Sequence, residues 1–179
     1  MRAFGAIEAT AVERRALMPG DGLVARADVT MDRAFGVPAP PEVVWPWLIQ
    51  LGKARAGWYF PAAVERWIPR SKRGLRAIDQ RWQGLAVGDV IPDWGGAAAR
   101  FHVVELEPPH TIVYRDRRGR AEVSWAIVLT PAGPGATRLH LRLRLGNLRR
   151  RWLAASVGEL IDKLTIAGLA AGLRERVRG

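Results

Sequence analysis

The clearest pattern in the chain is the alternation of leucine with polar residues from Arg138 to Leu145. One face of this segment carries its four leucines, Leu139, Leu141, Leu143 and Leu145. A strand with one buried and one solvated face has this period of two. The segment therefore predicts a strand, and it explains Arg142 and Arg144 as residues of a solvated face.

Further strand candidates precede this one. They are Leu23–Val37, Leu85–Ile91, Arg100–Leu106, Thr111–Asp116 and Glu122–Leu129. Short turn segments rich in proline, glycine or arginine separate the later ones, such as Pro108-Pro109. Strands joined by short turns are typical of an antiparallel meander.

Short helices are predicted near the N-terminus and after the first strand. Val12–Leu17 is one candidate. The next begins at Pro40 and Pro41, which fit a first helical turn, and ends near Gly52. Another is predicted from Pro61 to Ile68, where Pro69 ends it.

The segment Val157–Leu173 predicts a long C-terminal helix, because it contains no proline and its apolar residues recur at helical spacing. The face expected to be buried consists of Val157, Leu160, Ile161, Leu164 and Gly168. Ser156 and Glu159 match a capping box, so the helix begins at Ser156 or continues from Asn147.

The opposite side of this helix is also apolar. It carries Ile166, Leu169, Leu173 and Val177. We expect either that residues 1–22 cover it or that it forms a homodimer interface.

Together these elements predict an α+β fold, in which a curved antiparallel sheet wraps around the C-terminal helix and two short helices follow the first strand. Residues 1–22 are expected to form an N-terminal extension, and residues 23–179 a single domain. A length of 179 residues is enough for a substantial core.

Composition narrows the classes of function. The chain has no cysteine, which excludes disulfides and thiolate chemistry. We find no signal peptide, and the longest apolar stretch, Leu164–Leu173, is about half of a membrane span. A cytoplasmic protein is expected.

The net charge of +11 favours a solvated basic surface, or else a surface for nucleic acid or anionic lipid. Arg149–Arg151 and the basic cluster at residues 66–81 are not explained by strand alternation.

Several segments resemble the START-like, or SRPBCC, superfamily of helix-grip proteins. The opening text is VPAPPEVVWPWLIQLG, Val37–Gly52, and a later segment is AGWYFPAAVERW, Ala56–Trp67. The strands WQGLAVGDVIPDW, FHVVELEPPHTIVYRD and SWAIVLTPAGPGATRLHLRLR are also similar to that superfamily. The resemblance covers about residues 28–177. It implies a deep cavity between sheet and C-terminal helix, which in the superfamily binds lipids, sterols, hormones or polyketides and in some members catalyses cyclisation or dehydration. Phe60-Pro61-Ala62 departs from the serine-tyrosine-aspartate run expected of its bacterial subgroup.

Candidate chemistry in the chain is sparse. The three histidines have no metal-ligand spacing, so no metal is expected, and no cofactor motif is present. Strand parity with Val104 and Leu106 places His102 on the inner face, as a general acid or base or as a satisfied polar residue at the sheet rim. Tyr114 is either a hydrogen-bond donor to a ligand or a packing residue. The eight tryptophans line an aromatic pocket or fill the core.

The leading hypothesis is therefore a protein that binds a small hydrophobic ligand. The residues predicted to form the binding site are Trp58, Tyr59, Trp67, His102, Tyr114, Trp125, Ile127, Leu141, Leu143, Leu160 and Leu164. An alternative is an enzyme of the polyketide cyclase or dehydratase type that uses His102 and Tyr114. A third is a basic surface module for nucleic acid or anionic lipid, although specific nucleic-acid recognition is not expected.

Overall fold

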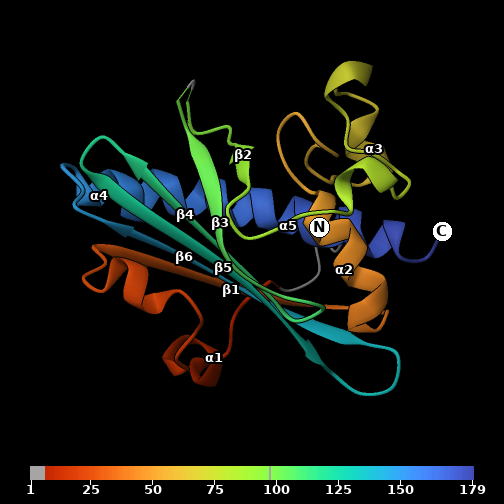
Figure 1. Cartoon of the computed structure of the whole chain (residues 1–179), viewed down its shortest axis with the longest axis horizontal. Helices are drawn as coiled ribbons and strands as arrows, with labels where there is room; N and C mark the ends of the chain where they lie inside the picture. Colours follow the sequence, from red (N-terminus) through yellow and green to blue (C-terminus); the bar gives the residue numbers. More distant parts are fainter. Residues whose placement is uncertain (1–6, 97) are drawn as a thin grey trace.

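A computed structural model describes residues 7–96 and 98–179 of the chain. Six antiparallel strands form one sheet in the order β1-β6-β5-β4-β3-β2, and the C-terminal helix crosses behind it (Figure 1). The strands are β1 Val29–Val37, β2 Val90–Pro92, β3 Arg100–Glu107, β4 Thr111–Arg118, β5 Ala121–Pro131 and β6 Thr137–Gly146. This α+β arrangement confirms the predicted helix-grip fold.

The helices of the N-terminal half are short. They are α1 Ala11–Arg15, α2 Pro41–Gln50 and α3 Ala62–Glu65, with 3-10 turns at Asp21–Val24, Arg70–Lys72 and Gln80–Trp82. Pro41 lies in the first turn of α2, as predicted, while Pro46 is tolerated inside it. The predicted strand Leu85–Ile91 is reduced to β2, and the predicted helix Pro61–Ile68 to the single turn of α3.

The inner face of the sheet carries the core. Leu139 and Leu141 of β6 pair with Leu129 and Ile127 of β5, and all four are buried in one cluster. The inner side chains of β1 and β4 extend this cluster, and the helix contributes Ile166, Leu169, Ala170 and Leu173 to it. Alternation on β6 therefore assigned its inner face correctly.

The C-terminal helical segment consists of α4 Arg151–Leu153, a π-helical stretch Ala154–Gly158 and α5 Glu159–Arg176. The predicted capping box is wrong, because Ser156 lies inside the segment and donates its hydroxyl to the Trp152 carbonyl. Within the part of the chain that the structure describes, no helix has the length and apolar character needed to cross a membrane.

The predicted faces of α5 are reversed for the large side chains, although Gly168 is buried as predicted. Leu160 and Leu164 are 57% and 64% exposed, whereas Leu169 and Leu173 are fully buried. Glycines explain this choice, because Gly172 brings the helix against the backbone of Tyr59 and Phe60. Large apolar side chains lie on both sides of the helix, but only the side with Gly168 and Gly172 permits this close contact.

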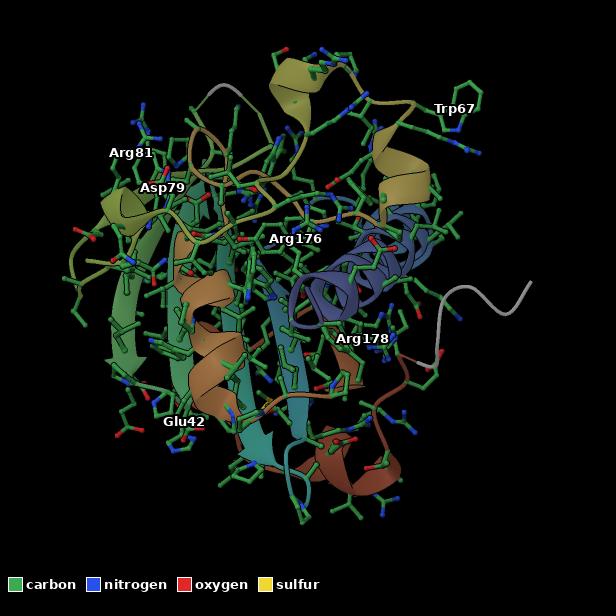
Figure 2. All side chains as sticks on the ribbon, turned by 90° about the vertical axis from the view of Figure 1, so that its right-hand side faces the viewer. Glu42, Trp67, Asp79, Arg81, Arg176 and Arg178 are labelled. Carbon is green, nitrogen blue, oxygen red and sulfur yellow. The ribbon has the colours of Figure 1, made fainter. Side chains whose placement is uncertain are left out.

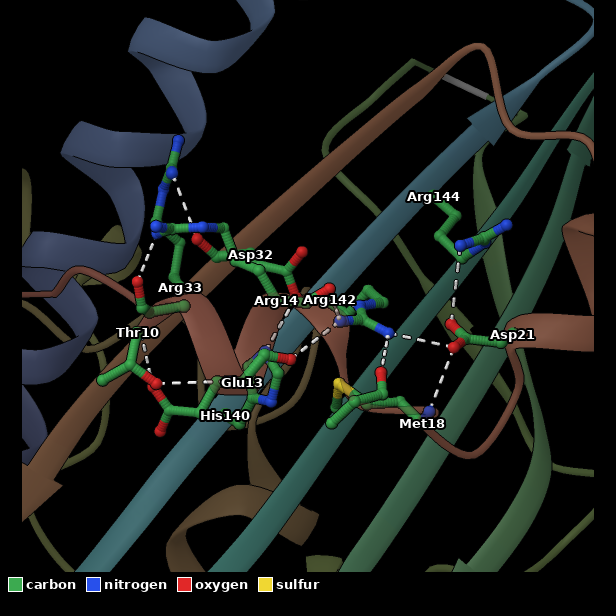
Figure 3. A network of polar contacts seen from close by, with 12 residues as sticks. Thr10, Glu13, Arg14, Met18, Asp21, Asp32, Arg33, His140, Arg142 and Arg144 are labelled. Atoms are coloured by element: carbon green, nitrogen blue, oxygen red, sulfur yellow. Dashed lines mark hydrogen bonds and ion pairs between the residues drawn. The ribbon is translucent and has the colours of Figure 1, made fainter.

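The outer face of the sheet is also covered, and this corrects the prediction of a solvated face there. Arg142 is 4% exposed. Its guanidinium donates to Asp32 and Asp21 and to the carbonyls of Ala16, Glu13 and Arg14 (Figure 3). Residues 13–24 thus lie against the outer face of the sheet. Ile7 instead belongs to the inner core cluster, and Glu8 forms an ion pair with Lys163 of α5.

Asp32 is the buried carboxylate of this outer network. Burial alone raises the pKa of Asp32, but hydrogen bonds from His140 and Arg142 outweigh it and hold the pKa below its ordinary value. Met18 adds an apolar contact to Val113 and Ala126 on the same face. The arginines of β6 therefore hold the N-terminal segment and do not form a free basic surface.

A second buried arginine connects α5 to the segment that contains α3. Arg176 donates to the Glu65 carboxylate and to the Phe60, Gly172, Gly74 and Leu75 carbonyls. Figure 2 shows Arg176 inside the molecule, whereas Trp67 projects outward from the α3 segment. This anchor holds the C-terminal end of α5 in place.

Candidate functional site

A cavity of about 690 Å³ lies between the inner face of the sheet and the N-terminal half of α5. The helix contributes Gly158, Ile161, Asp162, Thr165 and Ile166 to its lining. Trp94 and Ile161 line it and are also 51% and 59% exposed. The cavity therefore opens to solvent between the end of β2 and α5.

Aromatic rings form much of the wall. Trp125 stacks on Tyr114 with ring centroids 5.5 Å apart, and on Trp58 at 6.2 Å. Phe101 and Trp94 extend the cluster on either side. The Trp58 indole also donates a hydrogen bond to the Thr165 carbonyl, at 3.1 Å. The aromatic wall is thereby fixed to α5.

Two ionic groups interrupt the apolar lining. On the sheet side, Arg118 bonds to Asp93 and to the buried Asp116, with 2.7 Å between Arg118 Nε and Asp116 Oδ2. On the helix side, Asp162 Oδ2 lies 2.9 Å from Nε of Arg33. Arg33 shares the inward parity of β1, so this ion pair explains a charged residue on an otherwise apolar face.

Burial affects two ionisable groups at the cavity. It raises the pKa of Asp162; Glu159 raises it further, and Arg33 only partly offsets both effects. Burial also raises the pKa of Tyr114, whose phenol therefore stays neutral. Tyr114 lines the cavity, and no described residue hydrogen-bonds to its hydroxyl.

Of the residues predicted for the site, the cavity lining includes Trp58, Tyr114, Trp125 and Leu143. Tyr59 is fully buried nearby, and its hydroxyl donates to the Trp47 carbonyl and accepts from Gln50. Ile127 and Leu141 are in the closed core.

Four predicted site residues lie outside, namely Trp67, His102, Leu160 and Leu164. Leu160 and Leu164 face solvent because the helix faces are reversed. Trp67 is 80% exposed, with the Arg66 guanidinium over its ring. These placements correct the predicted positions.

His102 is exposed and does not face the cavity. The reason is a β-bulge in β3, where the register to β4 shifts between Val103 and Glu105. Counting back from Leu106 across the bulge assigns His102 to the wrong face. Phe101 and Val103 point inward in its place.

The predicted homodimer surface is also wrong. Ile166, Leu169 and Leu173 are buried in the core of one chain, and Val177 packs against the same cluster. They are not available to a second copy. The homodimer explanation for this face therefore does not hold. The sheet covers it together with Tyr59 and Phe60, and Ile7 of the N-terminal segment belongs to the same core cluster. Residues 1–6 lie outside the described part of the chain.

Sequence reasoning missed several lining residues. They are Trp94, Phe101, Phe60, Arg118 and Asp162. One available signal was the pair of pattern breaks, since Arg33 interrupts an apolar strand face and Asp162 an apolar helix. Among residues 7–96 and 98–179, no group of three or more histidine, aspartate or glutamate side chains is arranged to hold a metal ion.

Comparisons agree with this architecture. Residues 27–176 match the family model described as polyketide cyclase / dehydrase and lipid transport, so the chain belongs to that family. No curated protein matches the sequence.

Solved structures show the same fold. A protein from Rhodobacter sphaeroides is 15% identical, with a TM-score of 0.52 over 85% of this chain and 93% of that one. A protein from Chromobacterium violaceum is 18% identical, with a TM-score of 0.50 over 84% and 97%. At these identities the likeness concerns the fold alone.

Proposed function

We propose that the protein binds a small hydrophobic ligand in the cavity between its sheet and the N-terminal half of α5. The observation that carries this proposal is the cavity itself, about 690 Å³ and lined largely by aromatic and aliphatic side chains. Sites for small molecules fall in this range of volume and have this mixture of apolar walls and few polar groups. The family description, which includes lipid transport, supports the same class of ligand.

The aromatic wall favours a ligand with a flat or compact apolar body. Stacked and edge-to-face rings at Trp58, Trp94 and Trp125 present π-surfaces to the cavity. The opening beside Trp94 and Ile161 supplies a route of entry.

The alternative of a cyclase or dehydratase that uses His102 with Tyr114 has no support in the geometry. His102 is exposed and is absent from the cavity lining. The two side chains cannot act together on one ligand, so binding is the better-supported function.

A neutral fluorescent probe, N-phenyl-1-naphthylamine, tests the proposal. Its emission is expected to rise on mixing with the protein, as it does when the probe leaves water. Leu143→Trp places an indole in the cavity and should weaken binding at least about tenfold, a change of ~1.4 kcal/mol. Native mass spectrometry after exposure to a cell extract then identifies the natural ligand.

The matched control is Leu17→Trp, the same substitution at a site 94% exposed in the N-terminal segment. It should bind the probe as the unaltered protein does. If Leu143→Trp does not fold, Ile161→Trp at the opening serves the same purpose. Equal probe binding by the cavity variant and the control would contradict the proposal.

A further inference from the structure

Asp162 lines the cavity with a carboxylate that accepts no hydrogen bond from another described side chain. Oδ2 and Arg33 Nε are 2.9 Å apart, but both atoms are buried and neither is in hydrogen-bonding geometry. Among the described residues, none donates a hydrogen bond to the other oxygen, Oδ1. A buried carboxylate in this state is costly unless a donor meets it.

The side chain lies where a ligand can reach it. Asp162 is part of the cavity lining, one turn before Thr165, which holds the Trp58 indole. Arg33 is not part of the lining and is 8% exposed at its side chain. A ligand stacked on the aromatic wall would therefore meet the carboxylate and not the guanidinium behind it.

The remaining charges of the lining do not favour an anion. Its charged residues are Asp93, Arg118 and Asp162. Arg118 is already bonded to two carboxylates, those of Asp93 and Asp116. The lining is thus richer in acceptors than in free cations, although the whole chain carries a net charge of +11.

Resting on the proposed binding function, we propose that Asp162 anchors the polar group of the ligand, and that this group is a hydrogen-bond donor, an alcohol or a protonated amine, and not a carboxylate. The raised pKa of Asp162 is consistent with this assignment, because burial disfavours the charged carboxylate and Arg33 only partly offsets that effect. The aromatic rings of the wall then select a ligand with an apolar body, and Asp162 selects a ligand with a hydrogen-bond donor.

Four naphthalene compounds that differ in one substituent test the assignment. They are 2-(aminomethyl)naphthalene, 2-(hydroxymethyl)naphthalene, 2-methylnaphthalene and 2-naphthoate, and each competes with N-phenyl-1-naphthylamine for the cavity. The unaltered protein should bind the amine and the alcohol more tightly than the methyl compound, and the carboxylate most weakly. Tighter binding of 2-naphthoate than of the amine would overturn the assignment and point to Arg118.

Asp162→Asn should weaken binding of the amine about tenfold or more, because a charge-assisted hydrogen bond is lost. Binding of 2-methylnaphthalene should not change. The matched control is Glu159→Gln, which removes a carboxylate 3.7 Å from Arg33 on the same helix but outside the cavity lining.

The outcomes separate the two proposals. If the probe does not bind, or binds Leu143→Trp and Leu17→Trp equally, ligand binding itself is refuted. If all bind but Asp162→Asn and Glu159→Gln have the same relative affinities as the unaltered protein, only the role of Asp162 is refuted. If Asp162→Asn does not fold, the ranking of the four compounds on the unaltered protein still tests whether the cavity prefers a hydrogen-bond donor to a carboxylate.

Discussion

Both halves of α5 carry large apolar side chains, but these side chains have different surroundings. From Ile166 to Leu173 the helix packs directly on the sheet and on Tyr59 and Phe60, with its large side chains buried. From Glu159 to Thr165 it pairs with Arg33 of β1, lines the cavity on one side and exposes leucines on the other. One half therefore stabilises the fold, and the other borders a site.

The largest expected difference between the halves comes from introducing a charge. Leu169→Glu buries a carboxylate without a partner and should cost about 4 kcal/mol or more of the free energy of unfolding. Leu164→Glu, at an exposed position of the other half, should change it by less than about 0.5 kcal/mol. Urea denaturation followed by circular dichroism measures both, and equal effects would contradict the assigned faces.

Adding one methyl group gives the next contrast. A Cβ at Gly172 would lie 2.7 Å from the backbone of Tyr59, so Gly172→Ala should destabilise by about 1–3 kcal/mol. At Gly158 the nearest atom, Cε of Met31, would be 3.5 Å away. Gly158→Ala should therefore stabilise by up to about 1 kcal/mol, since alanine favours helix. Thermal unfolding compares the two, and a loss at both sites would show that the N-terminal half is packed as closely.

The hydrogen bond from Trp58 to the Thr165 carbonyl lies at the boundary between the halves. Trp58→Phe removes the donor and should cost about 1 kcal/mol. Trp152→Phe is the control, because that indole is 67% exposed. Urea denaturation should detect a loss only for Trp58→Phe, and probe binding should weaken in parallel. No change in either quantity would mean that the aromatic wall is not held by α5.

The smallest expected effect is on the pH dependence of stability. The pKa of Asp162 is raised above its ordinary value of 3.8, so the folded state binds this proton more tightly than the unfolded state. Its contribution is therefore most favourable at low pH and is lost as pH rises from 3.8 through the folded pKa. Over this range the free energy of unfolding should fall with pH by a fraction of ~1.4 kcal/mol per pH unit.

Urea denaturation at several pH values isolates this slope as a difference between variants. Asp162→Asn should lack it, whereas Glu159→Gln should keep most of it, because burial is the largest cause of the raised pKa of Asp162. Groups with lowered pKa, such as Asp32, contribute a slope of opposite sign in every variant and cancel in the comparison. Parallel curves for the unaltered protein and Asp162→Asn would contradict the raised pKa.

Local patterns predicted most of the sheet but only part of the site. Alternation identified β6 and its inner face, because all the leucines of this strand lie on one face and its histidine and arginines on the other. Alternation assigned His102 to the wrong face, because a single bulge at Val104 reverses the side-chain parity and the residue types of β3 do not indicate it. Trp94 and Asp162 were missed because their roles depend on elements far away in the sequence.

The order of elements, the antiparallel sheet and the apolar character of the C-terminal helix follow from the sequence itself, since periodicity and turn residues act over short distances. The tertiary structure decided which face of α5 is buried and whether the arginines of β6 are exposed to solvent. Both questions depended on partners that local pattern does not encode: the glycines against Tyr59 and Phe60, and the N-terminal segment around Arg142. The cavity arose in the same way, between the sheet and the N-terminal half of α5.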